Sequence, residues 1–101
     1  MSGYAIVYTP EAEDHLLALF QYLAIEASPA IATRFTDAIV ERCESLGDFP
    51  ERGAPRFDIR PGLRTLPFRR VTITYAVKAQ QVIIVGIFYG GQDYESILGE
   101  A

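Results

Sequence analysis

A helix-start signal occurs twice near the beginning of the chain, and it limits the possible folds more than any other feature. Thr9 precedes Pro10, and Ser28 precedes Pro29. A Ser or Thr side chain can accept a hydrogen bond from the first turn of a helix, and proline suits the first helical position because its missing N–H has no partner there. The sequence therefore predicts two helices that start at residues 10 and 29.

Apolar residues recur at helical spacing after each start signal. They are Ala12, Leu16, Leu19, Phe20 and Leu23 after the first signal, and Ala32, Phe35, Ile39, Cys43 and Leu46 after the second. This spacing predicts one helix to about residue 26 and a second that stops at Gly47. Because only two or three residues separate them, the helices should fold back as an antiparallel hairpin with one apolar face each.

Three other segments have the periodicity of strands. Residues 4–8 and 71–78 alternate in side-chain character and are rich in aromatic and β-branched types. Residues 82–88 are continuously apolar, which is typical of a strand buried on both faces. We therefore expect two half-buried strands and one interior strand.

The fold class follows from the order of these segments. A weaker strand is expected at residues 63–66, where Pro67 would end it or place it at an edge, and a short helical turn is expected at residues 94–98. The resulting order β-α-α-β-β-β predicts an α+β fold, in which an antiparallel sheet of three to four strands packs against the N-terminal helical hairpin.

The length and residue types limit the organisation and the chemistry. A chain of 101 residues that is half hydrophobic fits one domain, residues 1–101. It has no apolar run of about 18 residues and no basic start, so a soluble cytoplasmic protein is expected, without a membrane segment. Cys43 and His15 are the only residues of their types, so we predict no metal site, no cofactor and no internal disulfide. Cys43 should be an inert apolar residue and His15 a solvated or core-edge residue.

Residues 49–70 hold most of the positive charge of an acidic chain. The formal net charge of −4 argues against direct nucleic-acid binding by the protein alone. Residues 1–51 carry two basic and nine acidic side chains, whereas residues 52–78 carry seven basic and one acidic. This block suggests an anionic partner; the alternative is that the arginines are solvated or paired with the acidic helices.

The candidate partner-binding residues come from this block and from the end of the last strand. They are Arg56, Arg60, Arg64, Arg69, Arg70 and Tyr89. Arginines interleaved with aromatic residues can bind the carboxylates of an acidic protein segment or the phosphates of a nucleic acid with stacked bases, and both alternatives stay open. Asp37, Glu41 and Glu44 are expected on a solvated helix face, so no catalytic residue is predicted.

Several motifs, in order over almost the whole chain, resemble the ParE branch of the RelE/ParE toxins of bacterial type II toxin–antitoxin systems. They are the opening Tyr-Ala-Ile-Val-Tyr-Thr-Pro-Glu-Ala-Glu of residues 4–13, Ser28-Pro29 with Ala32 and Phe35, the turn Leu46-x-x-Phe49-Pro50-x-x-Gly53, the segment Ile59-Arg60-Pro61-Gly62-Leu63-Arg64, and the close Tyr89-Gly90-Gly91-Gln92-Asp93. The fold known for this family agrees with the order of elements predicted above.

The resemblance implies a toxin that binds DNA gyrase as a protein inhibitor and catalyses nothing itself. It also implies a ParD-like antitoxin, encoded beside the toxin, whose disordered tail wraps the toxin surface in a hetero-oligomer. At the close of the chain, Tyr89 and Gln92 stand where ParE toxins more commonly have His and Arg.

Two alternatives to the hypothesis of a gyrase-binding toxin stay open. The RelE branch cleaves messenger RNA on the ribosome, and such an enzyme would here use Arg64, Arg69, Arg70 and Tyr89. Thr72 stands where that branch has an arginine in the third strand, and no cation follows the last strand. The second alternative is a homologue that binds the antitoxin without being toxic.

Overall fold

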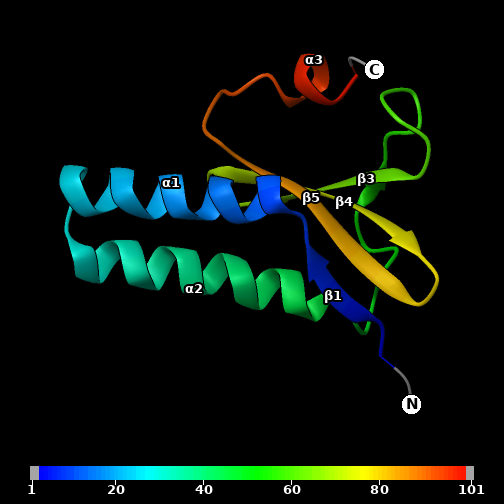
Figure 1. Ribbon diagram of the computed structural model, residues 1–101, viewed down its shortest axis with the longest axis horizontal. Coiled ribbons are helices and arrows are strands. Elements are labelled where there is room, and N and C mark those ends of the chain that lie inside the picture. Colours follow the sequence, from blue (N-terminus) through cyan, green and yellow to red (C-terminus); the bar gives the residue numbers. More distant parts are fainter. Residues whose placement is uncertain (1–2, 100–101) are drawn as a thin grey trace.

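A computed structural model describes residues 3–99 of this chain (Figure 1). Its elements are β1 (Ala5–Tyr8), α1 (Pro10–Glu26), α2 (Pro29–Ser45), β2 (Ala54–Pro55), β3 (Leu63–Phe68), β4 (Val71–Lys78), β5 (Gln81–Tyr89) and α3 (Tyr94–Gly99). The two long helices lie side by side, and the strands form a sheet next to them (Figure 1). The predicted α+β class, helical hairpin and short C-terminal helical turn are confirmed.

Both long helices begin at the predicted start signals. The side-chain oxygen of Thr9 accepts a hydrogen bond from the backbone N–H of Ala12 at 3.1 Å, and that of Ser28 accepts one from Ile31 at 3.1 Å. Each cap satisfies a backbone donor that has no partner within its helix. The two caps set the start of each helix, and the apolar residues that follow at helical spacing form its buried side.

The sheet has five strands in the order β1-β5-β4-β3-β2, which is more than the three to four expected. It is mixed, because β1 pairs in parallel with β5 while all other pairs are antiparallel. The fifth strand, β2, has only two residues. It lies within residues 49–70, which contain four prolines and are called the proline-rich segment below. Periodicity could not reveal so short a strand, because its pairing with β3 is set by the tertiary fold.

The weak strand predicted at residues 63–66 is longer than expected. β3 continues through Pro67 to Phe68 and pairs with β4 along its whole length. β2 covers only Arg64 and Thr65 on the other side of β3, so Pro67 lies at an open edge. A missing N–H costs nothing at an edge position, and the strand therefore passes through the proline.

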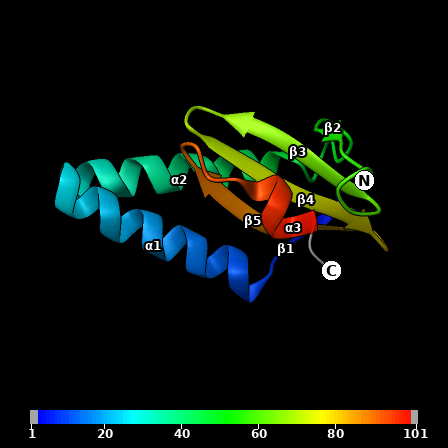
Figure 2. The same ribbon diagram turned by 90° about the horizontal axis from the view of Figure 1, so that it is seen from above.

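The sheet separates two apolar clusters. The larger cluster fills the space between the sheet and the helical hairpin, and the smaller one, built on Leu63, Phe88 and Leu98, lies where α3 packs. Figure 2 shows α3 over the sheet, on the side away from α2. Burial on both sides explains the continuously apolar sequence of β5, and the predicted interior strand is confirmed.

A β-bulge in β5 determines which residues face each cluster. Thr74 pairs with Gly86 and Tyr75 pairs with Ile84, so Val85 is an extra residue on β5. In an uninterrupted strand, side chains three positions apart point to opposite faces. Because of the bulge, Ile84 and Ile87 both belong to the larger cluster, while Val85 contributes to the smaller one.

Within residues 3–99, no helix is both long enough and apolar enough to cross a lipid bilayer.

Candidate partner-binding surface

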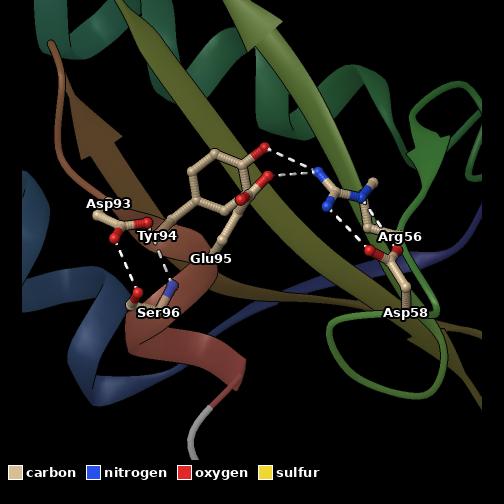
Figure 3. Close-up of polar contacts among 6 residues, drawn as sticks. All are labelled: Arg56, Asp58, Asp93, Tyr94, Glu95 and Ser96. Atoms are coloured by element: carbon tan, nitrogen blue, oxygen red, sulfur yellow. Dashed lines mark hydrogen bonds and ion pairs between the residues drawn. The ribbon is translucent and has the colours of Figure 1, made fainter.

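Arg56 joins the proline-rich segment to α3 (Figure 3). Its guanidinium donates to both carboxylate oxygens of Asp58 at 3.0 Å, to Glu95 at 2.9 Å and to the hydroxyl of Tyr94 at 3.4 Å. These four residues are called the α3 clamp below. Hydrogen bonds from Arg56 hold the pKa of the Asp58 carboxyl below its usual range, and those to Asp58 and Glu95 raise the pKa of Arg56.

The first turn of α3 is fixed by a second carboxylate. Asp93 accepts hydrogen bonds from the backbone N–H of Ser96 at 3.2 Å and from its hydroxyl at 2.8 Å (Figure 3). These bonds from Ser96 also lower the pKa of Asp93. Together with the α3 clamp, they place a helix of only six residues on the sheet.

Two further arginines of the proline-rich segment bind backbone carbonyl groups of their own chain. Arg60 donates to the carbonyl oxygen of Leu98 at 3.1 Å. Arg64 donates to those of Glu51 and Gly53 at 3.2 and 2.9 Å. Both arginines therefore hold loops and helix ends in place, a role that the sequence analysis did not foresee.

The two remaining predicted arginines, Arg69 and Arg70, form the β3–β4 turn. Arg70 lies near Tyr89, and Arg69 lies near other arginines around Phe68. Arg69 and Arg42 both lie against the ring of Phe68, with their Cζ atoms 4.9 and 4.8 Å from its centroid. Arg52 donates to the hydroxyl of Ser45 at 3.2 Å. A surface hollow of about 420 Å³ is lined by Ala38, Glu41, Arg42, Ser45, Arg52, Phe68 and Arg69. We call Arg42, Arg52, Phe68 and Arg69 the turn cluster.

The turn cluster includes a residue that the sequence analysis missed. Arg42 lies on α2, within the acidic half of the chain, and only the packing of α2 against the sheet brings it to Phe68. The sequence contains one indication of this position of Arg42. Arg42 directly precedes Cys43 on the buried stripe of α2, so its side chain must emerge at the border between the helix and the sheet.

Tyr89 lies at the opposite side of the same turn. Its ring centroid is 6.0 Å from the Cζ atom of Arg70, 6.0 Å from the ring of Tyr22 and 6.1 Å from the ring of Phe35. A second hollow, of about 320 Å³, opens beside it between α1 and β5. Its lining residues are His15, Ala18, Leu19, Tyr22, Ile87, Tyr89 and Gln92.

Side chains satisfy the backbone of β5 along this second hollow. Nδ1 of His15 accepts a hydrogen bond from the N–H of Ile87 at 3.1 Å, and Oε1 of Gln92 accepts one from Tyr89 at 2.8 Å. The ring of His15 also packs on Phe88, at a centroid distance of 5.0 Å. His15 is therefore a core-edge residue, which is one of the two positions predicted for it.

The structure thus distributes the six predicted partner-binding residues over three places. Arg56 and Arg60 lie beside α3, Arg64 lies over the loop before β2, and the other three surround the β3–β4 turn. Within residues 3–99, Arg69 and Arg70 donate no side-chain hydrogen bond and form no ion pair. Among the five predicted arginines, Arg69 and Arg70 are therefore the two whose guanidinium groups have no hydrogen-bond or ion-pair partner in the described part of the chain.

Two side chains of reactive types, Cys43 and Tyr8, lie in surroundings that keep them protonated. Cys43 is fully buried, and burial raises the pKa of its thiol to about 12. Burial also raises the pKa of the Tyr8 hydroxyl, which donates to Glu44 at 3.0 Å. Cys43 is thus the apolar core residue that was predicted. No group of three or more His, Cys, Asp or Glu side chains within residues 3–99 could hold a metal ion.

Comparisons with known proteins identify relatives over most of the chain. Residues 6–94 match a family model described as the ParE toxin of the type II toxin–antitoxin system parDE. The toxin ParE3 of Caulobacter vibrioides is 32% identical over 71 residues, which cover 66% of this chain and 71% of that protein.

Solved structures agree in fold. The chromosomal ParDE toxin–antitoxin system of P. aeruginosa includes a chain that matches with a TM-score of 0.76 and 25% identity, over 86% of this chain and 96% of that one. The RelBE2 toxin–antitoxin complex of Mycobacterium tuberculosis includes one with a TM-score of 0.68 and 20% identity, over 86% and 98%. At 20% identity, this second likeness concerns the fold alone.

Proposed function

Since this chain belongs to the ParE toxin family of type II toxin–antitoxin systems, we propose that it inhibits DNA gyrase by binding it and that a cognate ParD-like antitoxin neutralises it. In this proposal the chain acts in the cytoplasm as a binding protein. Membership of the family leads us to expect gyrase as the target, an antitoxin as the neutralising partner and an action without catalysis.

The separation of Arg64 from Arg69, Arg70 and Tyr89 is the observation that supports binding over RNA cleavage. Arg64 opposes Tyr75 in the β3–β4 ladder, four residues before the end of β3, and its guanidinium holds backbone carbonyls. Four strand residues span about 13 Å. A cleavage site needs its cations and its acid or base around one phosphate. These four residues could not converge on one without rearrangement.

An antitoxin partner also agrees with the assemblies in which the matched structures were solved. The two matched structures are described as a ParDE toxin–antitoxin system and a RelBE2 toxin–antitoxin complex. We propose that this chain likewise forms a hetero-oligomer with an antitoxin and that the arginines at the β3–β4 turn take part in its protein contacts.

Expression of this chain alone in a bacterial host tests the proposal. We expect growth arrest with filamentation and DNA-damage signalling, and loss of supercoiling by purified gyrase when the purified chain is added. Coexpression of the antitoxin gene that lies beside the toxin gene should restore growth. Rapid arrest of translation with cleaved transcripts would instead establish the ribonuclease alternative. Normal growth with intact antitoxin binding would establish the non-toxic homologue.

A further inference from the structure

The turn cluster brings together positive charges that form no ion pair within the part of the chain that the structure describes. Arg42 and Arg69 contact the same ring, so their Cζ atoms lie no more than about 10 Å apart. Within residues 3–99 neither forms an ion pair, and both ion pairs of that part belong to Arg56. Because this separation is close to the Debye length of about 8 Å at physiological salt, the two charges repel each other in the free protein. An anion bound between them would remove this repulsion.

The aromatic residues at this site favour carboxylates over the bases of a nucleic acid. Single-stranded nucleic acid binds through stacking of its bases on free aromatic faces. The ring of Phe68 already carries two guanidiniums, and the ring of Tyr89 lies among Arg70, Tyr22 and Phe35. A base would have to displace these contacts. A carboxylate needs only the N–H donors of the arginines, and within residues 3–99 the side chains of Arg42 and Arg69 donate no hydrogen bond.

The charges around the cluster favour the same class of partner. Glu41 lines the hollow together with the arginines, and Asp37 and Glu41 line a neighbouring hollow with Arg69. A continuous row of phosphates would meet repulsion from Glu41. A protein segment can space its carboxylates to meet Arg42, Arg52 and Arg69 and to avoid Glu41.

The backbone conformation at Arg69 is one that disfavours residues with a side chain. This suggests that the arginine contributes something other than stability of the fold. Arg69 occupies a two-residue turn with φ of 56°, in the left-handed region where glycine is favoured. Glycine at this position would suit the turn better but would remove a cation from the cluster.

We propose that the turn cluster binds the carboxylates of an acidic, extended protein segment through Arg42, Arg52 and Arg69. The inference deepens the proposed function, on which it rests for the expectation that the partner is a protein. It also separates the arginines that bind a partner from Arg56, Arg60 and Arg64, which stabilise the fold.

Binding of a synthetic acidic peptide to the full chain tests the proposal. The probe is a fluorescent peptide of about twelve residues in which Glu alternates with Thr, and its anisotropy is followed at about 50 and about 300 mM NaCl. We expect saturable binding that weakens about tenfold at the higher salt. Arg42→Glu together with Arg69→Glu should weaken it at least about tenfold at low salt. Arg69→Gly should also weaken it while leaving the unfolding midpoint unchanged or higher.

Lys78→Glu is the matched control. It changes the charge by −2, as Arg42→Glu and Arg69→Glu each do singly, and these single variants are measured beside it. Lys78 is exposed at the far end of β4 from the β3–β4 turn, so its substitution should leave peptide binding unchanged. Absence of saturable binding would overturn the proposal, as would equal weakening by Lys78→Glu. Tighter binding of a thymidine oligonucleotide of equal charge would assign the cluster to nucleic acid instead. The proposed function is tested independently, by gyrase inhibition and growth arrest with the wild-type chain. A failure of those tests can therefore be distinguished from a failure of peptide binding.

Discussion

Gly53 lies where two parts of the core approach too closely for any side chain. Its N–H donates to the hydroxyl of Tyr75 at 2.8 Å, and Tyr75 is fully buried. A Cβ atom at position 53 would lie 2.7 Å from that hydroxyl and 2.8 Å from the carbonyl oxygen of Thr65. The second neighbour is backbone, which cannot turn aside as a side chain can. Glycine at position 53 is therefore a requirement of packing.

We predict that Gly53→Ala lowers the free energy of unfolding by about 1–3 kcal/mol, because the backbone must shift to admit the methyl group. Tyr75→Phe should lower it by about 1–2 kcal/mol, because the buried N–H of Gly53 loses its acceptor. Urea unfolding followed by circular dichroism measures both. Gly91→Ala is the control, since no atom lies within 4 Å of a Cβ at that position. An effect of Gly53→Ala no larger than that of Gly91→Ala would contradict the prediction.

At the scale of elements, the β4–β5 turn contains two residues whose side chains disfavour its backbone conformation. Ala79 and Gln80 form a two-residue connection, and both have positive φ, 52° and 64°. Asn-Gly is the preferred pair for such a turn, because Asn tolerates and Gly favours the left-handed region.

Replacing Ala79-Gln80 by Asn-Gly should therefore raise the free energy of unfolding by about 1 kcal/mol. The thermal midpoint of the purified chain measures this gain. Ala79→Val, which places a β-branched residue in the left-handed region, should have the opposite sign. Equal midpoints for the two variants would show that the turn conformation does not limit stability.

The α3 clamp gives this element a dependence on pH. Arg56 holds the pKa of Asp58 below its usual value, so the contribution of this pair is complete above about pH 4 and is lost as the pH falls through the lowered pKa. In Arg56→Gln, the pKa of Asp58 should rise toward its usual value. The backbone amides of α3 should then exchange with solvent faster, while those of β4 stay protected.

Carboxyl titration by NMR measures the pKa of Asp58, and hydrogen exchange measures the opening of α3. Arg34→Gln serves as the control because Arg34 lies on α2 and lines a hollow remote from α3. An unchanged pKa of Asp58 in Arg56→Gln would show that the ion pair does not form in solution.

At the scale of the whole molecule, the features predicted correctly from sequence are those decided within a few residues. The caps at Thr9 and Ser28 act over three positions, and the apolar stripes that follow repeat with each helical turn. Both helices could therefore be placed to within a residue or two. The pairing of β1 with β5 and of β2 with β3 depends on the tertiary fold, which no local pattern encodes.

The candidate site was predictable in its residue types but not in its geometry. The basic segment was apparent, and Arg69, Arg70 and Tyr89 do surround one turn. The sequence could not show that Arg56 would meet Glu95, which lies 39 positions later, or that Arg42 would reach Phe68 from α2. In each case the contact exists because a helix packs on the sheet.

The parallel pairing of β1 with β5 has a consequence for the newly made chain. Ala5 pairs with Gln81, which lies 76 positions later. At a synthesis rate of about 5–20 residues per second, this interval lasts about 4–15 s. α2 ends at Ser45, so about 2–7 s of this interval remain in which the apolar faces of both long helices exist without β5, the strand that lies between β1 and β4. Pairings between residues so distant also slow folding. Each molecule therefore passes through a period of seconds on the ribosome in which chaperones and proteases can reach it before the finished surface exists.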